Sequence, residues 1–297
     1  MSDGYIALFL NQTMLLSIGL FWFNNVKRWV IYIHHIKGMF DKALDKYNQS
    51  LEKAKESGDM DMIALNLNHM AEIYYIKGMY DQAINLYNQS LNLAKELGDQ
   101  KGIGRALNNI SMVYDVKGDS DQALNLYNQS LEIKIKIGDQ KGIGRTLNNM
   151  AGVYEVRGHY DQALEMYNRS LENAKEVGDK DGISRTLNNM AGVHYNKGDS
   201  DQAINLYNQS LNLAKELGDQ YGMCQTLNNI SAIYHNEGEY GYALYYAIQS
   251  YELLKRLNVP EAQRSLDIIS SIRDTIGKED FDILEYSVKR KINNLLD

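Results

Sequence analysis

Polar side chains with binding chemistry recur along this sequence at intervals of 40 residues. Arg105 is followed four positions later by Asn109, and the same spacing returns at Arg145 and Asn149. Asparagine offers both N–H donors and a carbonyl acceptor, whereas arginine can hold a carboxylate through two parallel hydrogen bonds. Residues of these types in a regular row indicate a surface that binds polar groups.

The row lies on one face of a series of predicted helices. Spacings of four, three and four residues place its members on the side opposite the apolar stripe of each helix. The candidate binding residues are Arg105, Asn109 and Met112; Arg145, Asn149 and Gly152; Arg185, Asn189, Gly192 and Asn196; and Gln225, Asn229 and Asn236. In an alternative interpretation, the Asn and Arg side chains only solvate an exposed face.

Two glycines in this row, Gly152 and Gly192, are unfavourable inside a helix. Each costs about 1 kcal/mol relative to alanine, which indicates that a ligand approaches the backbone closely there. The asparagines that directly precede the row are expected to bond between neighbouring repeat units instead. These are Asn108, Asn148, Asn188 and Asn228.

The elements that must position these residues are copies of one 40-residue unit. A fixed period of this size predicts a solenoid, which adds length without adding separate cores. We therefore expect one array in the 297 residues rather than two domains. The recurring positions are Gly38, Gly78, Gly118, Gly158, Gly198 and Gly238, and Ala43, Ala83, Ala123, Ala163, Ala203 and Ala243.

Each unit is predicted to form two helices. Over residues 101–116, small and apolar residues from Ala106 to Tyr114 follow a 3.6-residue period. Gly118 supplies a left-handed helix end, and Asp119 can cap the helix that follows. Small residues at Ser111 and Ala123 let the two helices of a pair approach closely.

The pattern resembles the tetratricopeptide repeat family. The matching positions, in order, are Leu107, Ser111, Tyr114, Gly118, Ala123, Tyr127 and Ser130. The period is longer than the family's usual one, and the Pro near the end of the second helix is absent. Both differences indicate longer helices, similar to those of kinesin light chains and Pins-type polarity adaptors, whose connecting segments resemble the one at Gly98, Asp99 and Gly102.

The resemblance implies an all-α fold, a right-handed superhelical solenoid of antiparallel helix pairs. It also implies that the first helices line an inner groove, where an Asn at the place of Asn109 binds the main chain of an extended peptide. The arginines of the row add a preference for acidic peptides. We therefore predict a non-catalytic protein-interaction scaffold, with a ligand- or peptide-responsive sensor module as the alternative.

The repeats are expected to cover residues 37–258, as one partial and five full units. Residues 259–297 then form a pair of capping helices, and residues 1–36 are irregular and hydrophobic. The uncharged stretch from Tyr5 to Phe23 has three interpretations: an end cap, a disrupted repeat, or a membrane anchor with the repeats on the cytoplasmic side. An array with degenerate ends is also suited to self-association through them.

Composition argues against several other functions. A net charge of −7 argues against nucleic acid as the main partner, because phosphate binding needs a basic surface. The lone Cys224 excludes a disulfide framework and indicates a reducing, cytoplasmic location. The histidines have no metal-ligand spacing and no phosphate-binding loop follows a strand, so we predict no enzyme activity, no metal and no cofactor.

Overall fold

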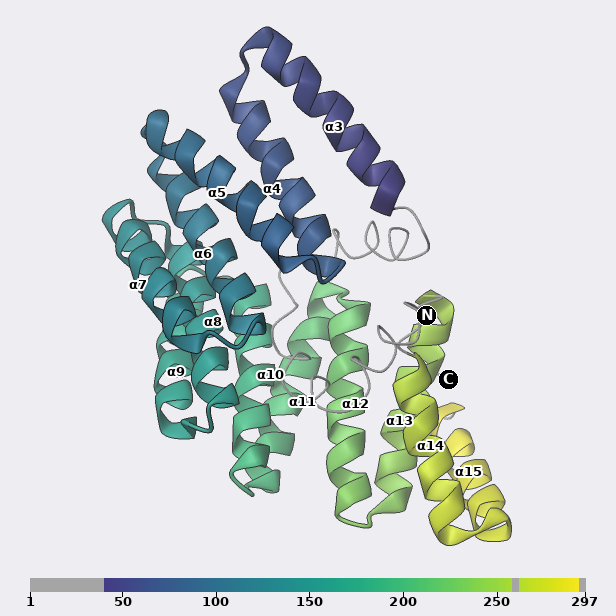
Figure 1. The fold of residues 1–297 in the computed structure, drawn as a ribbon. Helices are drawn as coiled ribbons and strands as arrows, with labels where there is room; N and C mark the ends of the chain where they lie inside the picture. The colour runs from purple at the N-terminus through teal and green to yellow at the C-terminus, as the bar shows by residue number, and fades with distance from the viewer. Residues whose placement is uncertain (1–39, 258–261, 294–297) are drawn as a thin grey trace. The chain divides into compact units, whose positions relative to one another are not determined.

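The computed structural model describes residues 40–257 and 262–293. All regular secondary structure in these two ranges is helical and comprises thirteen α-helices, α3 to α15 (Figure 1). The helices are α3 (Phe40–Ser57), α4 (Met60–Ile76), α5 (Tyr80–Glu96), α6 (Gln100–Val116), α7 (Ser120–Lys136), α8 (Gln140–Val156), α9 (Tyr160–Glu176), α10 (Lys180–Asn196), α11 (Ser200–Leu217), α12 (Gln220–Asn236), α13 (Tyr240–Leu257), α14 (Ala262–Ile276) and α15 (Lys278–Asn293). The predicted all-α solenoid of helix pairs is confirmed.

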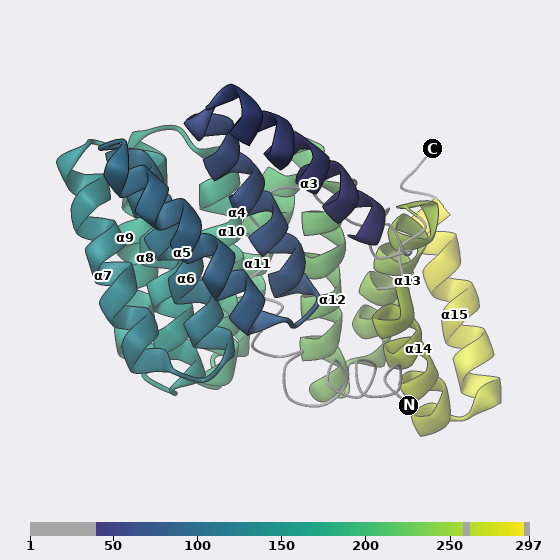
Figure 2. The ribbon, with the colours of Figure 1, turned by 45° about the horizontal axis from the view of Figure 1, so that its top comes forward.

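The chain divides into two compact units, and the boundary falls within α10. Of the described residues, the N-terminal unit holds 40–182 and contains α3 to α9. The C-terminal unit holds the described residues from 183 onward and contains most of α10 together with α11 to α15. Within each unit, successive helices run side by side in opposite directions (Figure 2).

Each described helix that precedes a repeat glycine ends in a Schellman motif. At the end of α6, Gly118 has a φ of 84°, a left-handed conformation that favours glycine. The Asp119 N–H donates to the Tyr114 carbonyl at 2.9 Å, and the Gly118 N–H donates to the Asp115 carbonyl at 2.9 Å. These bonds satisfy carbonyls that the helix leaves unpaired, so the glycine spacing fixes where the helices end.

An aspartate follows several of the helix-ending glycines and caps the next helix, as Asp119, Asp139 and Asp199 do. In the C-terminal unit, the Asp219 carboxylate accepts from the Gly222 N–H at 2.9 Å. A Cβ added at Gly222 would overlap that carboxylate. At Gly222 the carboxylate therefore occupies the space that a Cβ would fill, whereas the caps at Asp119 and Asp199 bond to Gln122 and Gln202, which carry side chains.

Close approach within a helix pair depends on small side chains. Ser111 and Ala123 are fully buried, as predicted. The Ser130 hydroxyl of α7 donates to the Gly104 carbonyl of α6 at 2.6 Å. The Ser170 hydroxyl of α9 donates to Gly144 of α8 in the same way, at 2.8 Å.

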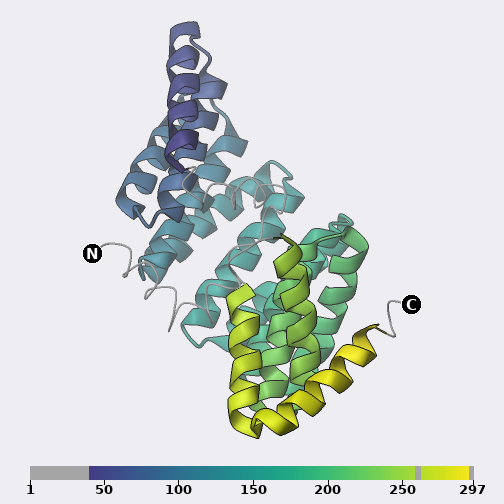
Figure 3. The same ribbon diagram turned by 90° about the vertical axis from the view of Figure 1, so that its right-hand side faces the viewer.

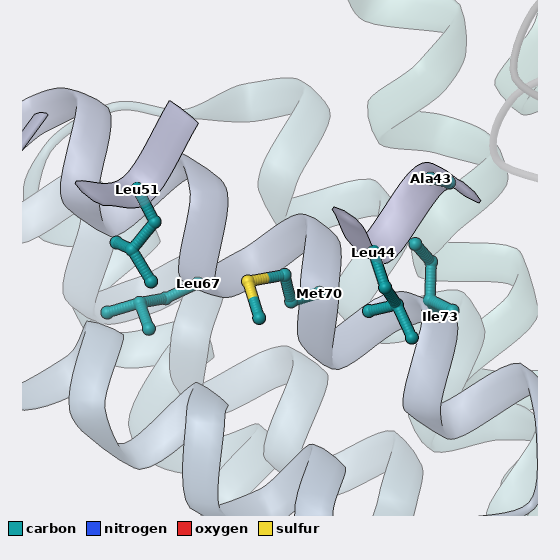
Figure 4. Close-up of a cluster of buried hydrophobic side chains, with 6 residues drawn as sticks. All are labelled: Ala43, Leu44, Leu51, Leu67, Met70 and Ile73. Carbon is teal, nitrogen blue, oxygen red and sulfur yellow. The ribbon is translucent and has the colours of Figure 1, made fainter. Parts of the chain in front are cut away.

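The N-terminal unit begins with a compact apolar cluster between α3 and α4. Ala43, Leu44 and Leu51 of α3 pack against residues of α4, and all six side chains of the cluster are buried (Figure 4). The α4 members are Leu67, Met70 and Ile73. Neither helix buries its stripe alone, which is the expected behaviour of a repeat array.

At the other end of the chain, α14 and α15 pack against α13 (Figure 3). Phe281 and Ile272 are fully buried beside Leu244 and Ile248. The Arg273 guanidinium lies 4.5 Å from the centre of the Phe281 ring. These two helices lie in the region predicted to cap the array.

The hydrophobic stretch from Tyr5 to Phe23 lies outside the described residues, as does the rest of 1–36. In the two described ranges, no helix is long and apolar enough to span a bilayer.

Candidate functional site

The exposed part of the predicted row in the N-terminal unit is cationic. Arg105 of α6 and Arg145 of α8 are exposed at equivalent positions of two first helices. Asn109 and Met112, one and two turns further along α6, are half-buried. This face offers two guanidinium groups and one accessible amide to a ligand.

Asn149 and Gly152 of the same row are buried. The Asn149 side chain is 6% exposed, and its Nδ2 donates to Asn108 Oδ1 at 3.5 Å. Asn108 Oδ1 also accepts from the Thr146 hydroxyl at 3.2 Å. Asn108 of α6 thus bonds to α8 of the next repeat, as predicted, and Asn149 belongs to the same contact rather than to the open surface.

Sequence reasoning missed Lys134, a buried cation in this contact. Lys134 of α7 is 5% exposed, and its Nζ donates to the Thr146 hydroxyl at 2.7 Å. Burial and, to a smaller extent, the nearby Arg145 charge lower the pKa of this amine to about 7, and the Asp139 charge opposes the shift. The available signal was a lysine at a position where other repeats carry alanine: Ala54, Ala94, Ala174 and Ala214.

Two carboxyl groups of the N-terminal unit, one buried and one half-buried, were also missed. Glu155 of α8 is 7% exposed and accepts from the Tyr167 hydroxyl at 3.1 Å. Burial raises the pKa of Glu155 to about 8, whereas the Tyr167 hydrogen bond lowers it. Burial also raises the pKa of Asp115 to about 6. Tyr75 stands at the equivalent position of an earlier repeat, so these acids replace an aromatic residue.

In the C-terminal unit, more side chains of the predicted row form hydrogen bonds within the protein than in the N-terminal unit. Asn229 is half-buried, and its Oδ1 accepts from the Arg264 guanidinium at 3.1 Å. Asn236 is exposed and donates to the Tyr195 hydroxyl at 2.6 Å. Of the remaining members, Arg185 and Gln225 are half-buried, Asn189 and Gly192 are buried, and Asn196 is exposed.

The asparagines that precede this row bond between repeats in the C-terminal unit as well. Asn188 Oδ1 accepts from the Thr226 hydroxyl at 3.2 Å. Asn228 Oδ1 accepts from the Ser265 hydroxyl of α14 at 2.8 Å, so its bond reaches a helix outside the predicted repeats. The prediction of bonds between repeats is confirmed for Asn108 and Asn188.

Cys224 lacks the environment of a reactive nucleophile. Its side chain is 1% exposed, and burial raises the pKa of the thiol to about 12. A thiol of this kind stays protonated at neutral pH. Among the described residues, no three His, Cys, Asp or Glu side chains form a group that could hold a metal ion.

Comparison of the sequence with models of known protein families identifies the repeat. A family model described as tetratricopeptide repeat matches residues 61–136, 142–216 and 182–256, which together cover more than half of the sequence. The chain belongs to the tetratricopeptide repeat family. The comparison with curated protein sequences found no match.

Several solved structures share the fold of this tetratricopeptide repeat chain. BtubC (BKLC) from P. vanneervenii is 20% identical with a TM-score of 0.62, over 74% of this chain and 92% of that chain. Rap protein complexed with competence and sporulation factor is 14% identical with a TM-score of 0.62, over 86% and 81%. Identities this low establish similarity of fold only.

The quorum sensor NprR is similar in two structures. Its apo form from B. thuringiensis is 16% identical with a TM-score of 0.62, over 94% of this chain and 77% of that chain. Its complex with the cognate peptide NprX is 18% identical with a TM-score of 0.53, over 96% and 75%.

Proposed function

We propose that this tetratricopeptide repeat protein is a non-catalytic interaction scaffold that binds an extended acidic peptide of a partner protein. The observation that carries the proposal is the pair of exposed guanidinium groups, Arg105 and Arg145, at equivalent positions of α6 and α8. Arginine can hold a carboxylate through two hydrogen bonds, and a repeated arginine suits a ligand that carries carboxylates at intervals. Asn109 would add a hydrogen bond to the peptide main chain, worth about 0.5–1.5 kcal/mol net.

The buried members of the row have a different part in this proposal. Asn149 is bonded to Asn108 and buried, so it would support the wall behind the ligand rather than contact it. The contacting residues of the N-terminal unit are then Arg105, Asn109, Met112 and Arg145. Arg185, Gln225 and Asn196 offer equivalent polar groups on the C-terminal unit.

A sensor module is the second candidate. Two proteins of similar fold support it: NprR is a quorum sensor solved with its cognate peptide, and Rap was solved with competence and sporulation factor. In a sensor, peptide binding would change the activity of a partner, whereas in a scaffold it would only bring partners together. Either function starts with capture of a peptide.

Selection from a random peptide library tests the proposal. The full chain should enrich peptides rich in Asp and Glu, and the double variant Arg105→Glu, Arg145→Glu should lose that enrichment. A matched control, Lys136→Glu with Lys175→Glu, makes the same charge change at exposed ends of α7 and α9. The proposal fails if the two double variants select the same peptides as the unchanged chain.

A further inference from the structure

Three tyrosines of α12 and α13 form an aromatic stack in the C-terminal unit. The Tyr234 and Tyr242 rings are stacked with centroids 5.0 Å apart. Tyr246 lies on Tyr234 at 5.8 Å, with its ring only 5° from parallel. Tyr242 is 52% exposed, so one aromatic ring of the stack is open to solvent.

Two of these three tyrosines are not needed to build the repeat. The residues equivalent to Tyr242 are Gln82, Gln122, Gln162 and Gln202. The residues equivalent to Tyr246 are Leu86, Leu126, Met166 and Leu206. Earlier repeats therefore pack without the aromatic pair, and its presence here calls for another physical reason.

The charge next to the stack is reversed relative to earlier repeats. In those repeats, a cation after the first helix pairs with an aspartate 36 residues earlier: Lys77 with Asp41 at 3.0 Å, Lys117 with Asp81 at 2.7 Å, and Arg157 with Asp121 at 2.7 Å. At the corresponding place in α12 the cation is replaced by Glu237, and its counterpart is Asp201. Within the described residues, no cation pairs with either carboxylate.

These carboxylates act on the stack. Burial raises the pKa of the Tyr234 hydroxyl, the neighbouring Tyr242 raises it further, and the charges of Glu237, Asp201 and Glu239 add to the shift. The Tyr234 ring therefore lies in a negative potential. An aromatic ring face and a carboxylate both attract cations, since the ring face carries partial negative charge.

The same tyrosine cluster already binds one cation of the chain. Tyr245 meets Tyr246 edge to face at 5.2 Å, and the Lys291 ammonium lies 5.3 Å from the Tyr245 ring centre. Tyr242 has no such cation among the described residues, although its ring is the exposed one.

We propose that Tyr242, which is exposed and stacked on Tyr234, binds a lysine or arginine side chain of a basic peptide segment in a partner protein, with the carboxylates of Asp201, Glu237 and Glu239 acting through the Tyr234 side of the stack. A cation over the ring would gain a cation–π contact, and the carboxylates would replace part of its hydration. The surface is chemically opposite to Arg105 and Arg145 of the N-terminal unit. The chain thus carries one surface for acidic peptides and another for basic ones.

The test uses the full chain and two labelled peptides, one of alternating Arg and Ala and one of alternating Glu and Ala. Fluorescence anisotropy should show that the full chain binds the Arg peptide, and the variants below assign that binding to this surface. The double variant Tyr242→Gln, Glu237→Lys restores residues that earlier repeats carry, so it is expected to fold. It should weaken binding of the Arg peptide by about tenfold or more. Tyr242→Phe keeps the ring and should bind nearly as well as the unchanged chain.

A matched control separates this surface from general charge attraction. Tyr286→Gln with Glu279→Lys makes the same two changes at exposed positions of α15. Unchanged binding in the control supports the proposal. Equal weakening in both double variants, or no weakening in the Tyr242 variant, overturns it. Reversing Arg105 and Arg145 should not weaken this binding, so the two surfaces can fail independently.

Discussion

Lys134 places a buried amine at a position where the neighbouring repeats have alanine. A buried lysine is costly when charged, and its hydrogen bond to Thr146 offsets only part of that cost. The folded chain therefore prefers the neutral amine, whereas the unfolded chain holds the ordinary, protonated one. The free energy of unfolding should rise with pH between about 7 and 10.5, because the unfolded state binds the extra proton in that window.

Replacing this amine should stabilise the protein at neutral pH. Lys134→Met keeps most of the volume and removes the charge, so the free energy of unfolding should rise by about 1–3 kcal/mol at pH 7. The gain should shrink towards pH 10, where the unfolded chain also begins to lose its proton. Urea denaturation at both pH values measures this. Lys136→Met, at an exposed position two residues later, should change little at either pH.

Glu155 gives the opposite dependence on pH. Its pKa rises from 4.5 to about 8 on folding, so the folded state holds a proton that the unfolded state has lost across this window. The free energy of unfolding therefore falls as pH rises from about 4.5 to 8.

Glu155→Gln should remove this loss, because a neutral amide oxygen can still accept from Tyr167. The variant should melt at a higher temperature than the unchanged chain at pH 8 and at nearly the same temperature at pH 4.5. Melting curves across that range measure the difference. Glu132→Gln, an exposed residue of α7, serves as the control. Parallel curves for the unchanged chain and Glu155→Gln would show that Glu155 is ionised in the folded protein.

At the scale of helices and turns, Gly222 is expected to act against the usual helix propensity of glycine. Glycine to alanine inside a helix ordinarily stabilises by about 1 kcal/mol. At Gly222 the added methyl group would displace the Asp219 carboxylate from the cap. A lost cap costs about 1 kcal/mol, and the displaced chain adds strain.

Gly222→Ala should therefore destabilise the protein, and the sign should change when the aspartate is removed first. In an Asp219→Ala background, Gly222→Ala should be neutral or stabilising. A double-mutant cycle by chemical denaturation measures the coupling between the two positions. Additive effects would show that the carboxylate and the glycine are independent.

Helix ends were predictable, and the buried part of the binding row was not. The helix predicted over 101–116 is observed as Gln100–Val116, because left-handed glycines and capping aspartates are local signals. The burial of Asn149 depends on how much of α8 the preceding first helix covers. The sequence of α8 alone does not determine that area. Periodicity shows which side chains share a face, but it does not show how much of that face the next repeat covers.

Lys134 and Glu155 illustrate a second limit of sequence-based prediction, which concerns the partners of buried charged residues. Each departs from the residue found in equivalent repeats, so a comparison between repeats could have singled out both. Periodicity identified neither the burial of these positions nor a partner for a charge there. Thr146 and Tyr167 are supplied by neighbouring helices.

At the scale of the whole molecule, each helix pair is stable because its neighbours cover it. The C-terminal unit ends in a cluster in which Ile272, Phe281 and Val288 cover Leu244 and Ile248 of α13. In a repeat array such end contacts protect the last apolar face from water.

A chain that ends at Leu257 should lose this cover. We expect a lower denaturation midpoint and increased binding of the dye ANS, since α13 would expose its apolar side. The double variant Ile283→Ser, Tyr286→Ser alters two exposed residues of α15 and should leave both measurements unchanged. A truncated chain as stable as the full one would contradict a capping role for α14 and α15.

The ion pairs across 36 residues have a further consequence for how this gene can change. Every such joint uses a cation from one repeat and an aspartate from the one before, so the joints are interchangeable. A deletion of residues 82–121 would bring Asp81 to the place of Asp121, opposite Arg157, with the bond intact. The helix sequence at 81–97 recurs letter for letter at 201–217, as recent duplication within the array would produce. Among the described residues, Asp201 and Glu237 occupy the equivalent positions without a cation, so a repeat lost or gained before Asp201 leaves the residues around Tyr242 unchanged.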